Sequence, residues 1–83
     1  MPNYAVVFTY SFDLDSAVYL FHDFESAVSF LRNSYEEEVR IDKEENEWET
    51  ISEITNDGRY AKITNIFCDH RDITEMHLAS IYQ

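Results

Sequence analysis

Residues 4–12 read Tyr-Ala-Val-Val-Phe-Thr-Tyr-Ser-Phe. Large apolar side chains stand at every second position of this stretch, from Tyr4 through Phe8 to Phe12, and mostly smaller residues alternate with them. A period of two places the larger side chains on one face of an extended chain, which is typical of a half-buried β-strand. The alternate positions include Val7, so both faces of this predicted strand carry apolar residues.

A second strand and a helix are predicted next. Residues 13–16, Asp-Leu-Asp-Ser, favour a turn because their short polar side chains can bond to the nearby backbone, and residues 17–22 then return as a strand paired with the first. Asp23 can cap a helix, and Glu25 adds a favourable charge near the positive end of the helix dipole. Apolar residues recur after that at steps of three and four, which puts on one face Phe24, Ala27, Val28, Leu31, Tyr35 and Val39. We expect an amphipathic helix from residue 24 to the low forties.

Three further strands complete the predicted fold. Residues 48–54 indicate a strand that reaches the turn Asn-Asp-Gly-Arg at 56–59, where Asp-Gly favours a hairpin because both residues tolerate positive φ. Residues 60–68 return as the next strand, and residues 69–72 form a polar turn. Residues 73–82 fit a fifth strand, although part of this stretch would also suit a short helix. Strand is the preferred prediction.

The predicted order is strand, strand, helix and three strands, or ββαβββ. This order indicates an α+β fold in which one amphipathic helix packs on one face of an antiparallel sheet. The 83 residues leave room for one hydrophobic core, so we expect residues 1–83 to form a single domain.

The composition is strongly acidic. Seventeen Asp and Glu residues stand against six Lys and Arg, for a formal net charge of −11. Nucleic acids and anionic membranes bind proteins through Lys and Arg, so we expect neither as a direct partner. Cys68 is the single cysteine, and the first residues lack a basic segment followed by a long apolar one, so we expect a cytoplasmic protein.

Most of the charge lies in the stretch from residue 36 to residue 53. This stretch contains two basic residues, Arg40 and Lys43. Its nine acidic residues are Glu36, Glu37, Glu38, Asp42, Glu44, Glu45, Glu47, Glu49 and Glu53. One interpretation is a solvated surface that keeps the protein in solution. The other is a partner-binding surface in which carboxylates replace the phosphates of a nucleic acid in a basic groove. We predict the contact carboxylates to be Glu36, Glu37, Glu38, Asp42, Glu44, Glu45 and Glu47.

Two aromatic residues are predicted at a contact surface. Tyr19 and Trp48 belong to the residue types that anchor protein interfaces, whereas most other aromatic side chains are needed for the core of so small a domain. A homodimer that joins the uncovered faces of two sheets, with no charged target, is the alternative function. The apolar residues on both faces of the first strand motivate it.

No catalytic, cofactor or metal site is predicted. Gly58 is the only glycine, which excludes glycine-rich phosphate loops. The spacing of Cys68, Asp69 and His70, together with His77 and His22 elsewhere in the chain, matches no zinc pattern. The acidic loop at residues 42–47 lacks the glycine of a calcium-binding loop. We therefore expect a binding protein rather than an enzyme.

The size, the acidity and one segment resemble a known group of proteins. The segment is Phe24-Glu25-Ser26-Ala27-Val28-Ser29-Phe30-Leu31, which follows a predicted strand and leads into an acidic helix end. In these features the first half of the chain resembles small acidic accessory proteins of Firmicutes bacteria and their phages, some of which are anti-CRISPR proteins. The resemblance implies an inhibitor of a basic, nucleic-acid-binding effector.

Overall fold

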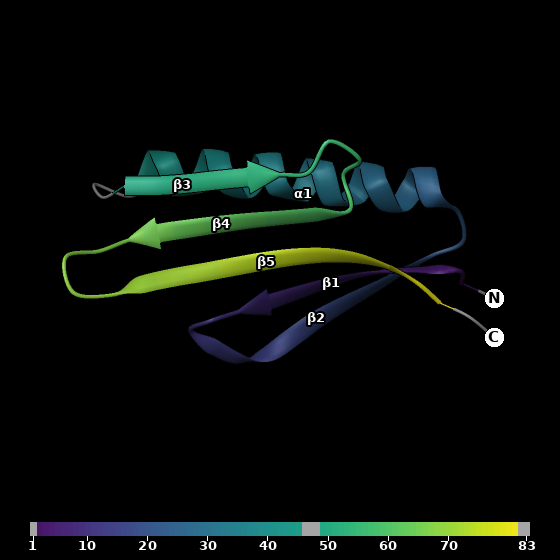
Figure 1. The fold of residues 1–83 in the computed structure, drawn as a ribbon, viewed down its shortest axis with the longest axis horizontal. Helices are drawn as coiled ribbons and strands as arrows, with labels where there is room; N and C mark the ends of the chain where they lie inside the picture. The colour runs from purple at the N-terminus through teal and green to yellow at the C-terminus, as the bar shows by residue number, and fades with distance from the viewer. Residues whose placement is uncertain (1, 46–48, 82–83) are drawn as a thin grey trace.

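The computed structural model describes residues 2–45 and 49–81, which form one antiparallel sheet and one helix (Figure 1). The elements are β1 (Tyr4–Tyr10), β2 (Asp13–Phe21), α1 (Phe24–Glu45), β3 (Glu49–Ile54), β4 (Tyr60–Ile66) and β5 (Arg71–Ser80). The order ββαβββ and the α+β class are as the sequence predicts. Residues 71–80 form a strand, so the preferred prediction for this stretch is confirmed and the alternative of a short helix is wrong.

The five strands lie in the order β2-β1-β5-β4-β3. β5 is the last strand along the chain and lies at the centre of the sheet, where it pairs with β1 on one side and with β4 on the other. It thereby joins the β1–β2 hairpin to the β3–β4 hairpin. β2 and β3 are the two edge strands.

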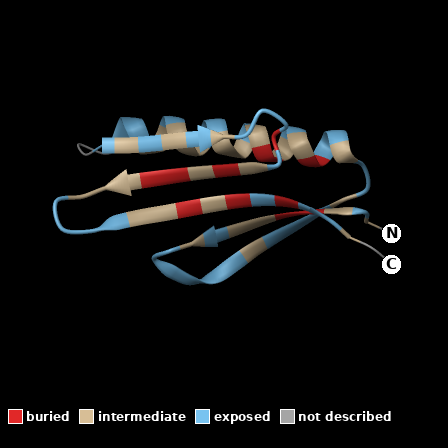
Figure 2. Cartoon of the chain, in the orientation of Figure 1, coloured by how far each residue is buried: buried red, intermediate tan, exposed pale blue. Residues whose placement is uncertain are grey.

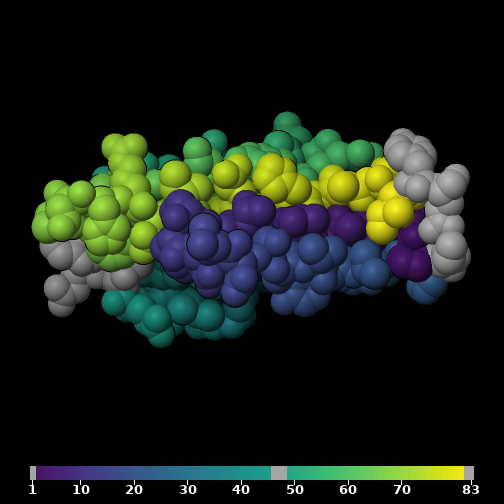
Figure 3. Space-filling view, turned by 90° about the horizontal axis from the view of Figure 1, so that it is seen from below, coloured from purple at the N-terminus to yellow at the C-terminus, as the bar shows by residue number. Residues whose placement is uncertain are grey.

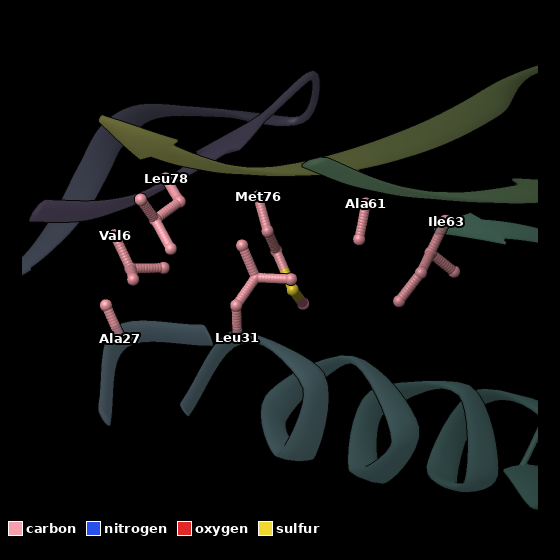
Figure 4. Packing of buried hydrophobic residues seen from close by; sticks show 7 residues of the cluster. All are labelled: Val6, Ala27, Leu31, Ala61, Ile63, Met76 and Leu78. Atoms are coloured by element: carbon pink, nitrogen blue, oxygen red, sulfur yellow. The ribbon is translucent and has the colours of Figure 1, made fainter. Parts of the chain in front are cut away.

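The hydrophobic core lies between α1 and one face of the sheet (Figure 4). Alternate residues of the three central strands point toward the helix, which follows from the period of two along a strand. They meet two helix residues that are one turn apart. The buried cluster consists of Val6, Ala61, Ile63, Met76 and Leu78 from the sheet and Ala27 and Leu31 from the helix. The opposite face of the sheet, which α1 does not cover, is called the open face below.

The helix begins where the sequence predicts, because Asp23 caps it. One carboxylate oxygen of Asp23 accepts the backbone N–H of Ser26 at 2.9 Å, and the other accepts the Ser26 hydroxyl at 2.9 Å. The bond from the Ser26 backbone, followed by the one from its hydroxyl, lowers the pKa of Asp23. The helix then runs to Glu45, slightly beyond the predicted low forties.

The first turn differs from the prediction. Residues 13–16 belong to β2, and the chain turns at Ser11 and Phe12, between the paired residues Tyr10 and Asp13. Ser11 lies against β5: its N–H donates to the Ile73 carbonyl at 2.8 Å, and its hydroxyl accepts the Ile73 N–H at 2.7 Å. These contacts with a distant strand place the turn at Ser11 and Phe12, before the polar residues 13–16 that predicted it. The pairing of β1 with β2 becomes irregular between Phe8 and Tyr10.

The turn between β3 and β4 lies at the predicted residues 56–59, but of Asp57 and Gly58 only Gly58 has a positive φ. Gly58 has a φ of 73°, and its N–H donates to the Thr55 carbonyl at 3.0 Å. A Cβ at this position would lie 2.9 Å from side-chain atoms of both Val28 and Arg32. Arg32 also donates to the Asn56 carbonyl at 2.9 Å. The turn is therefore packed on α1, and glycine is needed for both the backbone angle and the space.

α1 lacks the apolar character of a membrane-crossing segment, and no helix in the described part of the chain combines enough length with enough hydropathy to cross a bilayer.

Candidate functional site

The acidic stretch covers the second half of α1, and the helix divides its carboxylates between two sides. Successive residues turn by about 100°, so residues three or four apart share a side. Three carboxylates are exposed on the side of the helix away from the sheet, and we call them the outer group: Glu36, Glu37 and Glu44. Three other carboxylates lie toward the sheet and the helix end, and we call them the inner group. They are Glu38 and Asp42, both partly buried, and Glu45, which is exposed.

The outer group surrounds one guanidinium. Arg40 donates to Glu37 at 2.7 Å and to Glu44 at 3.2 Å, and its own side chain is 54% exposed. The hydrogen bond to Glu37 is the main reason why the pKa of Arg40 is raised. An open hollow of about 370 Å³ lies on this side, lined by Asn33, Glu36, Glu37 and Arg40. Exposed carboxylates in such an arrangement can accept hydrogen bonds and ion pairs from the Lys and Arg side chains of a partner.

The inner group connects the helix to the sheet. Asp42 accepts a hydrogen bond from the Asn65 amide on β4 at 2.9 Å, and the carbonyl end of that amide accepts the Thr50 hydroxyl on β3 at 2.8 Å. Burial raises the pKa of Glu38, and the neighbouring carboxylates of Asp42 and Glu45 raise it further. Asp42 and Glu38 therefore belong to the packing of the helix end on the sheet, a role that the sequence prediction did not include.

The glutamates of β3 point in a third direction. Glu49 and Glu53 alternate with residues that face the helix, such as Thr50, so their side chains lie on the open face and are exposed. In the strand register, Lys62 on β4 lies opposite Glu53 on β3 and opposite Glu75 on β5. The acidic stretch thus spreads over the outer side of the helix, its inner side and the open face. Glu47 and Trp48 lie outside the described residues.

Tyr19 lies apart from the acidic residues. It is on β2, at the opposite edge of the sheet from β3, and is 44% exposed. Its ring packs against Phe30 at a centroid distance of 4.8 Å and against Phe8 at 5.5 Å. The structure therefore does not bring Tyr19 together with the predicted contact carboxylates.

The residues between β4 and β5 form a small polar loop. Cys68 is exposed there, and the His70 ring stacks on Phe67 at 4.6 Å and contacts the Asp69 carboxylate at 2.8 Å. The bond with His70 lowers the pKa of Asp69. The adjoining hollow of about 350 Å³ is open. Within residues 2–45 and 49–81, no three His, Cys, Asp or Glu side chains are arranged to hold a metal ion.

A second polar cluster lies on the open face. The Tyr60 hydroxyl donates to Glu75 at 2.7 Å, which raises the pKa of Tyr60 to about 12. His77 lies 3.7 Å from the same carboxylate and contacts the Tyr60 ring at 4.9 Å. This cluster was missed at the sequence level, although strand alternation and antiparallel pairing could have placed Tyr60 and His77 side by side. The Tyr60 hydroxyl is bonded to Glu75, and with His77 the cluster makes this part of the open face polar.

Comparison with known proteins adds no relative: no family model matches the chain, and neither the curated proteins nor the solved structures searched give a match.

Proposed function

We propose that this protein is a small acidic protein-binding module that binds a basic protein surface through the outer side of α1. On this proposal it acts as a phage-type inhibitor, similar in kind to anti-CRISPR proteins, which occupies the nucleic-acid-binding groove of an effector. The observation that supports the proposal is the outer group, in which three exposed carboxylates gather around one guanidinium. With the exposed Lys43, which lies three residues after Arg40, this helix side has a net charge of −1 (3 acids minus 2 bases).

The spacing of the outer group is compatible with replacing phosphates. Glu37 and Glu44 are seven residues apart, which corresponds to about 10 Å along a helix axis. Three phosphate steps of one strand of B-DNA cover about the same length. A rigid helix also presents these carboxylates with less loss of conformational freedom than a mobile acidic loop would.

Arg40 determines how the outer group meets a partner. In the free protein it holds Glu37 and Glu44 in place by two hydrogen bonds. A Lys or Arg of the partner can replace Arg40 as the ion-pair partner of Glu37 or Glu44, because both carboxylates are more than half exposed and need little desolvation. Binding through such exposed charges gains mainly association rate and is weakened by salt.

Displacement of a nucleic acid tests the proposal. A labelled single-stranded oligonucleotide is bound to each of a panel of basic nucleic-acid-binding proteins, and its release by the protein is followed by fluorescence anisotropy. We expect release from at least one panel member at low salt and less release as salt rises. A variant with Glu36→Gln, Glu37→Gln and Glu44→Gln should release less.

A second triple variant controls for net charge. Glu25→Gln, Glu49→Gln and Glu53→Gln remove the same three charges at exposed positions outside the outer group. This control should displace the oligonucleotide nearly as well as the unaltered protein. Equal losses in both variants would mean that net charge alone acts, and the outer group would not be the binding surface.

A further inference from the structure

The two edges of the sheet differ in charge. An edge strand presents unpaired backbone N–H and C=O groups, and charged side chains are the usual protection against pairing with another chain. β3 carries Glu49 and Glu53 on the open face. The stretch from Ser16 to His22 on and after β2 contains no Asp, Glu, Lys or Arg. The charged residues of β2, Asp13 and Asp15, lie at its start, so its later part, Ala17–Phe21, lacks the protection that β3 has.

The backbone pattern shows which groups of β2 point outward. The Ile81 N–H donates to the Asn3 carbonyl at 2.8 Å, which places the backbone groups of the odd-numbered β1 residues toward β5. The even-numbered β1 residues therefore bond to β2, where Val6 is opposite Tyr19. The backbone N–H and C=O groups of Val18 and Leu20, which alternate with Tyr19, consequently face outward.

The side chains at the same positions are apolar and exposed. Val18 is 56% exposed and Leu20 is 58% exposed, and both lie on the open face. Tyr19 lies between them on the helix side and is 44% exposed. β2 is coloured as exposed over most of its length in Figure 2, and it lies along the surface that faces the viewer in Figure 3.

We infer that β2 pairs antiparallel with β2 of a second copy of this chain, so that the two sheets become continuous. The regular part of β2 is Ala17–Phe21, because pairing with β1 becomes irregular beyond Phe8 and Ala17. The middle of this segment is Tyr19. A two-fold axis there places Tyr19 opposite Tyr19 of the second copy and Val18 opposite Leu20 of the second copy.

Charge favours a second copy at this edge over the other arrangements. Within Ala17–Phe21 this pairing puts no carboxylate opposite another, and the first opposed carboxylates, Asp15 and Asp23, lie beyond both ends of that segment. Pairing through β3 would bring together glutamates of both copies within the paired strands. Packing of two open faces would bury the charged side chains of Lys62, Glu53 and Glu75, which are cross-strand neighbours on that face. Edge pairing leaves these charged side chains in water and covers uncharged side chains, Val18 and Leu20 on the open face and Tyr19 on the helix side.

Light scattering over a range of concentrations tests the inference on the whole chain. We expect a mass that rises toward that of a dimer. Added salt should strengthen the dimer, because the two copies repel through a charge of −11 each while the contact itself is uncharged. Binding of a basic partner through α1 has the opposite salt dependence, so failure of one proposal is distinguishable from failure of the other.

Two matched variants locate the contact. Val18→Lys and Ile51→Lys each place a charge on the open face of an edge strand, at positions that are 56% and 42% exposed. Both lower the net negative charge equally. Val18→Lys should raise the dissociation constant of the dimer by about tenfold or more, because each copy would bury an ammonium group at the contact. Ile51→Lys should leave the dissociation constant unchanged.

Disulfide formation tests the pairing of residues. In proteins that also carry Cys68→Ser, we expect a mixture of Val18→Cys and Leu20→Cys to crosslink faster than either variant alone, because opposite residues lie within disulfide reach. A monomer at every concentration and salt level would overturn the inference and leave the edge to a strand of another protein. Equal crosslinking in the mixture and the separate variants, or equal effects of the two Lys variants, would also overturn it.

Discussion

Glu38 has an environment that favours its neutral form. It is partly buried on the sheet side of α1, and its pKa is raised above the ordinary value of 4.5 by burial and by neighbouring carboxylates. At pH values between the pKa of Glu38 in the unfolded chain and its higher pKa in the folded protein, the folded protein binds more protons than the unfolded chain does. The free energy of unfolding contributed by Glu38 therefore falls as the pH rises through that interval.

Replacing Glu38 with Gln should stabilise the protein at neutral pH. Removal of the like-charge pair with Asp42, four residues away, is worth about 0.2–0.5 kcal/mol, and the fall of stability with pH above 4.5 should become shallower. Urea unfolding at several pH values measures both effects. Glu36→Gln, on the exposed outer side, is the control. A stabilisation of the same size in the control would contradict the role of burial and proximity.

At the scale of elements, the contact of the helix end with the sheet depends on a short hydrogen-bond chain. Asn65 lies between Asp42 on α1 and Thr50 on β3 and bonds to both. Asn65→Ala would leave Asp42 and Thr50 without this partner, and we expect a loss of about 1–3 kcal/mol in the free energy of unfolding.

A double-mutant cycle with Asp42→Ala isolates the contact between α1 and β4. The coupling energy between Asn65→Ala and Asp42→Ala should be about 0.5–1.5 kcal/mol, as measured by urea unfolding. Additive effects would show that the Asp42 bond contributes nothing to the attachment of the helix end.

The elements that sequence predicts well are those with strong periodicity. The alternation of residues 4–12 and the three- and four-residue steps from Phe24 to Val39 are local patterns, and β1 and α1 follow them closely. The turn at Ser11 was misplaced because it depends on Ile73, which is far along the chain. The position of β5 between β1 and β4 likewise depends on long-range pairing that local patterns do not contain.

The candidate site could be predicted in part. The excess of carboxylates on α1 is visible in the sequence, but the prediction treated them as one surface. Applying the 100° steps to the acidic residues themselves would have placed Glu38 and Asp42 on the sheet side, and strand alternation would have placed Asn65 beneath them. Tyr19 could not be located relative to these residues, because the sheet order separates β2 from β3.

At the scale of the whole molecule, charge is unevenly distributed along the chain. The first 22 residues contain only Asp13 and Asp15 as charged residues, so the remaining 61 residues carry a net charge of −9, from 15 acids and 6 bases. The molecule measures 45 × 24 × 18 Å. At about 0.01 M salt, the screening length of about 30 Å is comparable to these dimensions, so the acidic groups repel one another across the fold.

Added sodium chloride should therefore stabilise the folded protein. We expect the urea midpoint to rise as sodium chloride increases from about 0.01 M to about 0.15 M, where the screening length falls to about 8 Å. The triple Gln variant of the outer group should show a smaller rise, because it carries three fewer charges. A midpoint that does not respond to salt would contradict a destabilising self-repulsion.

The central place of β5 has a consequence for synthesis on the ribosome. A nascent chain that ends before Arg71 can form the β1–β2 hairpin, α1 and the β3–β4 hairpin, but it lacks the strand that joins them and the core side chains of Met76 and Leu78. Isolated hairpins are marginally stable at best. The emerging polypeptide must therefore wait for residues 71–80 before its sheet can close, and until then its apolar first strand is available to chaperones.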